Sequence, residues 1–131
     1  MTKIKTHYHE RTELEKGFHF AQATKAGNLL FISGCISWDA DGTVMGPGDW
    51  PVQVRNVYEN LKRTLAEFGA TFENVVKETV YTTDMEAIVA NAAIRTEFLK
   101  DYTPPASTWV EIKRLVNADL LLEVEMTAVL S

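Results

Sequence analysis

Apolar residues recur along the chain with two different periods. Between Asp49 and Gly69 they return at steps of three and four, and charged side chains fall between them. This spacing is typical of an amphipathic helix. Asp49 is a suitable N-cap, Pro51 is tolerated in a first helical turn, and Gly69 ends the pattern. We therefore expect a helix between Asp49 and Gly69.

A second helix is predicted after Asp84, which can cap its first turn. It covers roughly Met85 to Asp101, and Pro104-Pro105 stops it because proline cannot continue a helix. Its expected apolar face consists of Ala87, Ala90, Ile94 and Phe98.

β-Branched and aromatic residues mark five further segments as strands. These are Phe18 to Thr24, Asn28 to Ser33, Val75 to Thr83, Ser107 to Leu115 and Leu120 to Leu130. The first two flank a turn in which Gly27 can adopt positive φ, so they should form a hairpin. The helix between the third and fourth strands implies a crossover and a parallel pair. The sequence thus predicts one α+β domain over residues 1–131, with a mixed sheet and two helices packed on one face.

The last predicted strand has one apolar face and one mixed face, because alternate residues of a strand point to opposite sides. The apolar face, which suits the helices, contains Leu122, Val124, Met126, Ala128 and Leu130. The mixed face contains Leu121, Glu123, Glu125, Thr127 and Val129. In the preceding strand we assign Val110 and Ile112 to the helix side, and Ser107, Trp109 and Glu111 to the mixed face.

Nothing in the predicted fold covers the mixed face. Large apolar side chains argue against a purely solvated surface, and unpaired carboxylates argue against a purely buried one. A partly wet interface between copies of the chain meets both demands. An open sheet face with scattered hydrophobic residues is the alternative.

Composition narrows the choice of partners. The 131 residues are 46% hydrophobic and 24% charged, with a net charge of −5. The most basic stretch, Thr2 to Arg11, reads as a solvated end, so no nucleic-acid partner is expected. Apolar runs are too short to span a membrane, the N-terminus lacks the apolar core of a signal peptide, and Cys35 is the single cysteine. We expect a cytoplasmic protein.

Six short segments follow one another from about Phe18 to the C-terminus. They are the hairpin Gly27 to Gly34 (GNLLFISG), Asn60-Leu61 with Gly69, the VVK and TDM ends of Val75 to Met85, Asn91, Pro104-Pro105-Ala106, and Glu123-Val124-Glu125. In this order they resemble the motifs of the RidA/YjgF family of reactive-intermediate deaminases.

The resemblance implies a chorismate-mutase-like fold and a homotrimer whose sheets line a central barrel. It also implies small-molecule clefts between subunits. The best-known family activity is the hydrolysis of enamines and imines, such as 2-aminoacrylate and 2-iminobutanoate, to keto acids and ammonia. No cofactor or metal is expected. Some family members act as endoribonucleases or translation inhibitors.

Several positions depart from the family pattern. In active members an arginine follows the PPA motif and holds the substrate carboxylate by two charge-assisted hydrogen bonds. The matching residue here is Ser107, and the cysteine that often follows is Trp109. The family's pocket tyrosine matches Phe20, and the glutamine after its Ser-Gly pair matches Cys35. Glu123, which matches the family glutamate that positions water, is kept.

These matches define the candidate site. Glu123 and Ser107 are the candidate catalytic residues. The candidate substrate-binding residues are Phe20, Ser33, Gly34, Cys35, Asn91 and Trp109. Without the arginine, the cleft should be more apolar and aromatic, and amino-acid-derived imines should be poor substrates.

Some of these residues have simpler interpretations. Glu123 is either a general acid–base or an interface carboxylate that only accepts hydrogen bonds. Cys35 reads more simply as a small buried hydrophobe than as a nucleophile. Trp109 stacks on a ligand, fills an interface, or does both. His7 and His9 form an HxH pair, but the sequence supplies no convincing third metal ligand.

Three functions from different classes follow. The first is a hydrolase of an enamine or imine other than the usual 2-imino acids. The second is a non-catalytic trimeric binder of a small metabolite, favoured by Phe20 and Trp109. The third is an RNA-directed nuclease, which needs a basic surface interleaved with aromatic residues that the sequence does not show.

Overall fold

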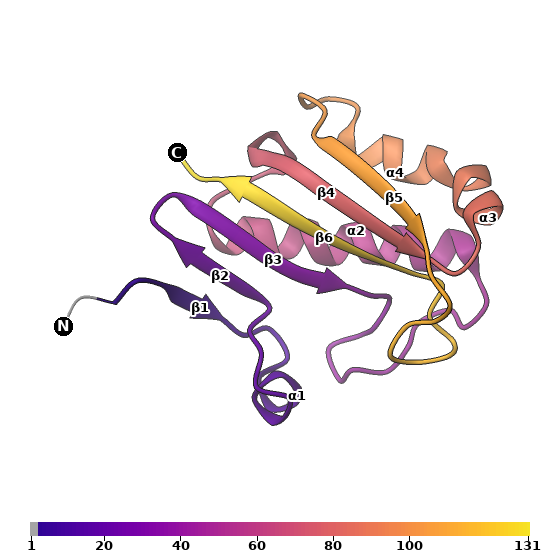
Figure 1. Ribbon diagram of the computed structural model, residues 1–131, viewed down its shortest axis with the longest axis horizontal. Coiled ribbons are helices and arrows are strands. Elements are labelled where there is room, and N and C mark those ends of the chain that lie inside the picture. The colour runs from indigo at the N-terminus through magenta and orange to yellow at the C-terminus, as the bar shows by residue number, and fades with distance from the viewer. Residues whose placement is uncertain (1–2) are drawn as a thin grey trace.

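The computed structural model describes residues 3–131, which form one six-stranded mixed sheet with helices (Figure 1). Along the chain the elements are β1 (Thr6–Tyr8), α1 (Thr12–Gly17), β2 (Ala23–Ala26), β3 (Leu29–Cys35), α2 (Trp50–Glu67), the 3₁₀ turn η1 (Phe72–Asn74), β4 (Val75–Thr82), α3 (Met85–Ala90), α4 (Ala92–Leu99), β5 (Ala106–Glu111) and β6 (Leu122–Val129). The strand order is β1-β2-β3-β6-β4-β5. Only β4 and β5 are parallel. The predicted hairpin, crossover and mixed sheet are confirmed.

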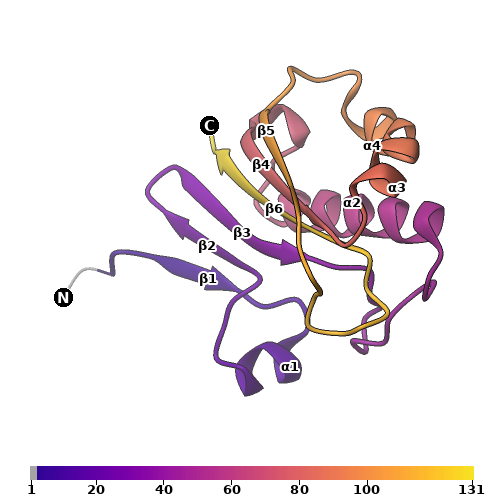
Figure 2. The ribbon, with the colours of Figure 1, turned by 45° about the vertical axis from the view of Figure 1, so that its right-hand side comes forward.

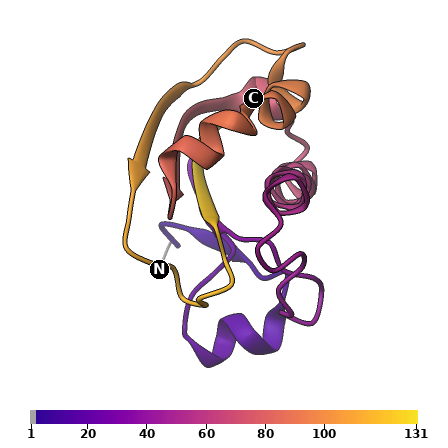
Figure 3. The same cartoon turned by 90° about the vertical axis from the view of Figure 1, so that its right-hand side faces the viewer.

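The helices α2, α3 and α4 lie on one face of the sheet, and no element of the described chain covers the other face (Figure 3). The short helix α1 lies beyond one end of the β2–β3 hairpin (Figure 2). No helix formed by residues 3–131 has the length and apolar character needed to cross a membrane.

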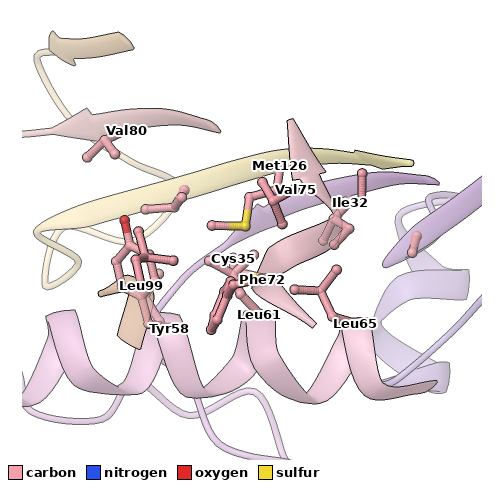
Figure 4. Close-up of a cluster of buried hydrophobic side chains, with 14 of the residues drawn as sticks. Ile32, Cys35, Tyr58, Leu61, Leu65, Phe72, Val75, Val80, Leu99 and Met126 are labelled. Carbon is pink, nitrogen blue, oxygen red and sulfur yellow. The ribbon is translucent and has the colours of Figure 1, made fainter. Parts of the chain in front are cut away.

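Helix α2 follows the predicted pattern closely. The Asp49 carboxylate accepts a hydrogen bond from the Val52 backbone N–H at 3.1 Å, which caps the first turn. Gly69 has a φ of 68°, which suits a residue that ends a helix without a side chain. The apolar face of α2 packs on the sheet around Tyr58, Leu61 and Leu65 and forms the main core (Figure 4).

The second predicted helix is divided in two at Asn91. The Asn91 side-chain amide donates to the Ala87 backbone oxygen at 2.9 Å, and its own N–H also bonds to the preceding turn. Asparagine competes with the helical ladder in this way, so the continuous helix was wrong at this point. The inward residue of α3 is Ile88, whereas Ala90, which we expected inside, is exposed.

The N-terminal region is more ordered than its charge suggested. Thr2 lies outside the described residues, but β1 pairs with β2, and Arg11 is buried. The Arg11 side chain donates to the Asp39 backbone oxygen at 2.6 Å, and its guanidinium lies 4.6 Å from the Trp38 ring centre. Residues 3–7 are exposed, as expected of a solvated end, but Tyr8 to Arg11 are partly or fully buried, so that interpretation was wrong for this part. The first hairpin strand also begins later than predicted, at Ala23.

The two faces of β6 are as predicted, but those of β5 are inverted. The face of β6 that starts with Leu122 is buried under the helices. In β5, Ser107 pairs with Glu78 and Trp109 with Val80, and both partners point into the helix-covered core. Neighbours across paired strands share a face, so Ser107 and Trp109 lie on the helix side. Glu111 lies there too, because its carboxylate accepts from the Met85 N–H that starts α3, whereas Val110 faces outward.

Candidate functional site

A cavity of about 640 Å³ opens at the end of the sheet where β3 and β6 meet the N-terminal region. Its lining comes from five segments: Leu14, Phe18 and Phe20 around α1; Ser33, Gly34 and Ile36 at the end of β3; Trp38, Gly42 and Val44 in the following loop; Val116, Asn117 and Leu120 before β6; and Glu123 in β6. Most of these side chains are apolar. Glu123 is the only ionisable group among them.

A β-bulge aims the Glu123 side chain into this cavity. In the β3–β6 pair, Ile32 opposes Met126 and Cys35 opposes Val124, so Ser33 and Gly34 together face a single residue of β6. Such a bulge bends the strand and redirects nearby side chains. The Glu123 carboxylate lies directly against Gly34, where an added Cβ would overlap it. Glycine at position 34 is therefore a requirement of the site.

The environment of Glu123 favours its neutral form. Burial raises the pKa of the Glu123 carboxyl, and the nearby charge of Glu125 raises it further. No hydrogen bond from residues 3–131 offsets this rise. Glu125 itself accepts a short hydrogen bond from the Tyr81 hydroxyl, and this contact raises the pKa of Tyr81. A partly buried carboxyl whose pKa is raised holds its proton more firmly than a free carboxyl does, which suits a group that both donates and accepts a proton.

Half of the predicted site residues meet at this cavity. Phe20, Ser33, Gly34 and Glu123 all line it. The Ser33 hydroxyl donates to the Ala21 backbone oxygen at 2.6 Å and so ties the end of β3 to the segment that carries Phe20.

Ser107 and Trp109 lie elsewhere, on the opposite face of the same sheet. The Ser107 hydroxyl donates to the buried Glu78 carboxylate at 2.7 Å and accepts from the Trp109 indole N–H at 2.7 Å. Arg95 of α4 forms an ion pair with Glu78, and its guanidinium lies 5.6 Å from the Trp109 ring centre. The Tyr58 hydroxyl donates to the second Glu78 oxygen at 3.0 Å. We call these five residues the Glu78 cluster.

Cys35 and Asn91 also lie away from the Glu123 cavity. Cys35 belongs to the core (Figure 4), and its sulfur accepts a hydrogen bond from the Gln22 amide at 3.3 Å. Burial raises the pKa of the Cys35 thiol to about 12, so it is a packed thiol and not a nucleophile at neutral pH. Asn91 lies in the helical layer between α3 and α4, on the other side of the sheet from Glu123.

Sequence reasoning missed most of the apolar wall. Phe18 and Val116 line the cavity and remain 74% and 77% exposed, respectively. Phe18 was expected at the start of a strand but follows α1 instead, and Val116 lies in a loop, so strand alternation could not place either side chain at the cavity. Large apolar side chains left this exposed around a concave surface are a common mark of a binding site.

The HxH pair is joined by no third candidate metal ligand in the described part of the chain. The His7 and His9 rings contact each other with centroids 4.8 Å apart, and His9 Nε2 lies 3.1 Å from the Phe20 backbone oxygen. Within residues 3–131, no three histidine, cysteine, aspartate or glutamate side chains are grouped as metal ligands.

Comparisons with known proteins agree with this architecture. The sequence profile of the endoribonuclease L-PSP family matches residues 11–130. A RutC family protein of Synechocystis is 40% identical over 112 residues, which cover 85% of each chain. The 3-aminoacrylate deaminase RutC of Acinetobacter baylyi is 28% identical over 109 residues, covering 83% of this chain and 85% of that protein. Among solved structures, the protein YjgH superimposes with a TM-score of 0.87 at 27% identity, covering 98% of both chains.

Proposed function

The chain belongs to the endoribonuclease L-PSP family, which includes the RidA, YjgF and RutC proteins, and we propose that it is a cofactor-independent deaminase-type hydrolase of enamines or imines. The observation that carries this proposal is the Glu123 carboxyl, which projects into an apolar cavity and has a raised pKa. The deaminase activity in the name of the Acinetobacter baylyi relative supports the same reaction class.

One carboxyl with a raised pKa is sufficient for this hydrolysis. Protonated Glu123 donates its proton to the carbon of the enamine, which becomes an iminium ion. The resulting carboxylate takes a proton from water as the water oxygen attacks the iminium carbon. Glu123 then passes this proton to the amino nitrogen, the C–N bond breaks, and ammonia leaves. The hydroxyl proton returns to Glu123 as the carbonyl product forms, so the enzyme ends in its starting state.

We propose that the substrate lacks the carboxylate of the usual 2-imino acids. By the resemblance of the PPA segment, Ser107 takes the position of the family's carboxylate-binding arginine, and its hydroxyl donates to Glu78. Within one copy, the cavity around Glu123 presents aromatic and aliphatic walls and no arginine or lysine. Arg95, the arginine beside Ser107 and Trp109, is already paired with Glu78. Such a surface favours a small apolar imine over an anionic one.

We further propose that the complete site forms between copies of the chain, in a homotrimer. Glu123 faces the uncovered side of the sheet, whereas Ser107 and Trp109 lie on its helix side at the β5 edge. One copy therefore cannot bring these residues together. The β5 edge of one copy placed against the Glu123 cavity of the next would do so.

The reaction is tested by measuring ammonia release from enzymatically generated 2-iminobutanoate, 3-aminoacrylate and an imine of a small aliphatic aldehyde. We expect turnover of the carboxylate-free imine and no measurable acceleration with 2-iminobutanoate. Glu123→Gln should lower kcat by about 10²–10⁴-fold, the usual contribution of a general acid–base. Glu59→Gln is the matched control, because it neutralises an exposed carboxylate of α2 far from the cavity, and it should retain most activity. Full activity of Glu123→Gln contradicts the mechanism, and rapid hydrolysis of 2-iminobutanoate contradicts the proposed substrate.

Assembly of the site from two copies is tested by complementation. Glu123→Gln and Trp109→Ala are purified separately, each with low activity, then mixed, dissociated and reassembled. If each site takes Glu123 from one copy and Trp109 from its neighbour, random trimers contain roughly a quarter of intact sites. Recovery of activity near that fraction supports the shared site. No recovery, with mixed trimers verified by mass, means that each copy acts alone.

A non-catalytic small-molecule binder is the second candidate function. The exposed Phe18 and Val116 side chains around the cavity favour a binding function, because they can hold an apolar ligand whether or not that ligand reacts. A thermal-shift screen separates the two functions. A ligand that raises Tm and is recovered unchanged after prolonged incubation supports binding without turnover.

A further inference from the structure

A second cavity, of about 570 Å³, lies at the β1 edge of the sheet and has a different character. Lys5, His7, His9, Lys16 and His19 surround it, and Phe20 forms an apolar wall. All three histidines of the chain are in this lining, and no acidic residue is. In a chain with a net charge of −5, this concentration of basic groups is local and is not a property of the whole surface.

The basic groups of this cavity are available to a ligand. Within residues 3–131, neither Lys5 nor Lys16 takes part in an ion pair. His9 is positioned by the Phe20 backbone oxygen, 3.1 Å from its Nε2 atom, and its ring contacts His7. The histidines do not form a metal site with other side chains of the described residues. The lysine and histidine side chains in this lining can all donate hydrogen bonds, and an anion is the ligand that accepts them best.

The turn after α1 brings three residues of the cavity lining together. His19 has a φ of 56°, a conformation that histidine adopts more readily than most non-glycine residues. It closes the turn in which the His19 N–H bonds to the Lys16 oxygen at 3.1 Å and the Phe20 N–H bonds to the Glu15 oxygen at 3.0 Å. Lys16, His19 and Phe20 all line the cavity, so this hydrogen-bonded turn fixes one part of its wall.

We propose that this basic cavity is a phosphate-binding site for inorganic phosphate or a small phosphomonoester. A phosphate group carries a charge of about −1.5 to −2 near neutral pH and three acceptor oxygens. The ammonium groups of Lys5 and Lys16 supply matching charge from two separate segments of the chain, and the imidazoles of His7 and His19 supply directional donors. The ring of Phe20 offers an apolar surface for the organic part of an ester. The site shares Phe20 with the Glu123 cavity, but the phosphate proposal does not depend on the proposed deaminase reaction.

The three histidines make the site directly observable by NMR. Because every imidazole of the chain lines the cavity, the histidine ring signals report on it without background. Inorganic phosphate and phenyl phosphate are titrated separately at fixed pH, with sodium chloride at matched ionic strength as the reference. We expect saturable shifts of the His7 and His19 signals that chloride does not produce. Tighter binding of phenyl phosphate identifies an ester that packs on Phe20, and equal affinities identify free phosphate.

Two kinds of variant distinguish a site from general charge attraction. Lys5→Gln with Lys16→Gln should weaken phosphate binding by about 10-fold or more, because each ammonium forms a charge-assisted hydrogen bond. Lys25→Gln with Lys113→Gln removes the same charge from exposed positions outside the cavity and should leave affinity unchanged. His19→Gly should keep or raise Tm, since glycine suits a φ of 56°, and yet weaken phosphate binding.

Three results would overturn the proposal. The first is a change in the histidine NMR signals that increases linearly with phosphate concentration and does not saturate. The second is an equal loss of affinity in both lysine double variants. The third is a response to an RNA oligonucleotide with none to either phosphate compound.

Discussion

Residue 34 lies on the floor of the Glu123 cavity, where there is no room for a side chain beside the Glu123 carboxyl. The bulge in β3 places this Cα against the Glu123 carboxyl, so the position of the acid and the absence of a side chain depend on each other. The proposed chemistry needs this contact because it fixes where the proton is delivered. Adding a methyl group at Gly34, a residue with no functional group of its own, should therefore disturb the reaction.

We predict that Gly34→Ala displaces the Glu123 carboxyl. The new methyl group overlaps the far end of that flexible, partly exposed side chain, which can move aside, so folding stability should change little. Deaminase activity should fall because the carboxyl is displaced, and urea denaturation checks that the fold is retained. Gly17→Ala is the control, because an added Cβ there meets no atom within 4 Å and should change activity little. An active and fully stable Gly34→Ala protein would show that the carboxyl is not fixed by this contact.

The raised pKa of Glu123 also predicts how stability depends on pH. Because burial raises this pKa above its ordinary value of 4.5, the folded state keeps the proton at pH values where the unfolded state has lost it. The contribution of Glu123 to stability is thus present below pH 4.5 and is lost as the pH rises through the folded-state pKa. Relative to wild type, Glu123→Gln should gain stability over that window. Denaturation series of both proteins against pH measure the difference, with Glu59→Gln, a neutralised exposed carboxylate of α2, as the reference, and parallel curves contradict the raised pKa.

At the scale of the elements, the Glu78 cluster joins parts of the fold that are distant in sequence. Glu78 of β4 bonds to Tyr58 of α2, Arg95 of α4 and Ser107 of β5, and its side chain is fully buried. A buried carboxylate is tolerated only when paired and hydrogen-bonded, and here all of its partners come from different elements. The cluster therefore holds the divided second helix against the sheet.

We predict that Arg95→Ala costs about 3–5 kcal/mol of folding stability, because it leaves a buried charge without its counter-ion. Arg55→Ala, which removes an exposed arginine of α2, should cost far less. Combining Arg95→Ala with Glu78→Gln removes the uncompensated charge, so the double variant should be more stable than Arg95→Ala alone. Thermal and urea unfolding of the four proteins provide the comparison. A smaller loss in Arg95→Ala than in Arg55→Ala contradicts a structural role for the ion pair.

The sequence predicted elements well where a single period dominated. Helix α2 and strand β6 have one clearly apolar face, so their packing followed from spacing alone. In β5 both faces mix polar and apolar residues, and only the pairing with β4 decides which face is inward. The positions of Ser107 and Trp109 therefore could not be obtained from alternation. Helix α1 has six residues and no repeated pattern, yet it supplies part of the cavity wall.

At the scale of the whole molecule, the face of the sheet opposite the helices carries partly exposed apolar side chains. Phe31 is 46% exposed there, and Leu29, Val110 and Val129 are also incompletely covered. Glu123 opens toward the same side. These features favour an assembly in which copies of the chain cover one another's sheets, as proposed above for the shared site.

We predict that the protein is a trimer in solution and that Phe31→Lys dissociates it, because a charge would be buried on the covered face. Val89→Lys adds the same charge to an exposed apolar residue on the helix side and should leave the trimer intact. Analytical ultracentrifugation of the three proteins over a range of concentrations measures their masses. A wild-type monomer at all concentrations contradicts the trimer. Equal behaviour of the two variants would mean that the sheet face is not the interface.

The position of β6 affects how the protein folds during synthesis. This strand is the last along the chain, yet it lies in the middle of the sheet between β3 and β4. Until residues 122–129 have left the ribosome, the two halves of the sheet have no strand to join them. Until then the apolar face of α2 stays partly exposed because the core is incomplete. Such exposure favours chaperone binding or aggregation of the nascent chain. The complete sheet and its core should therefore form only after β6 has been translated.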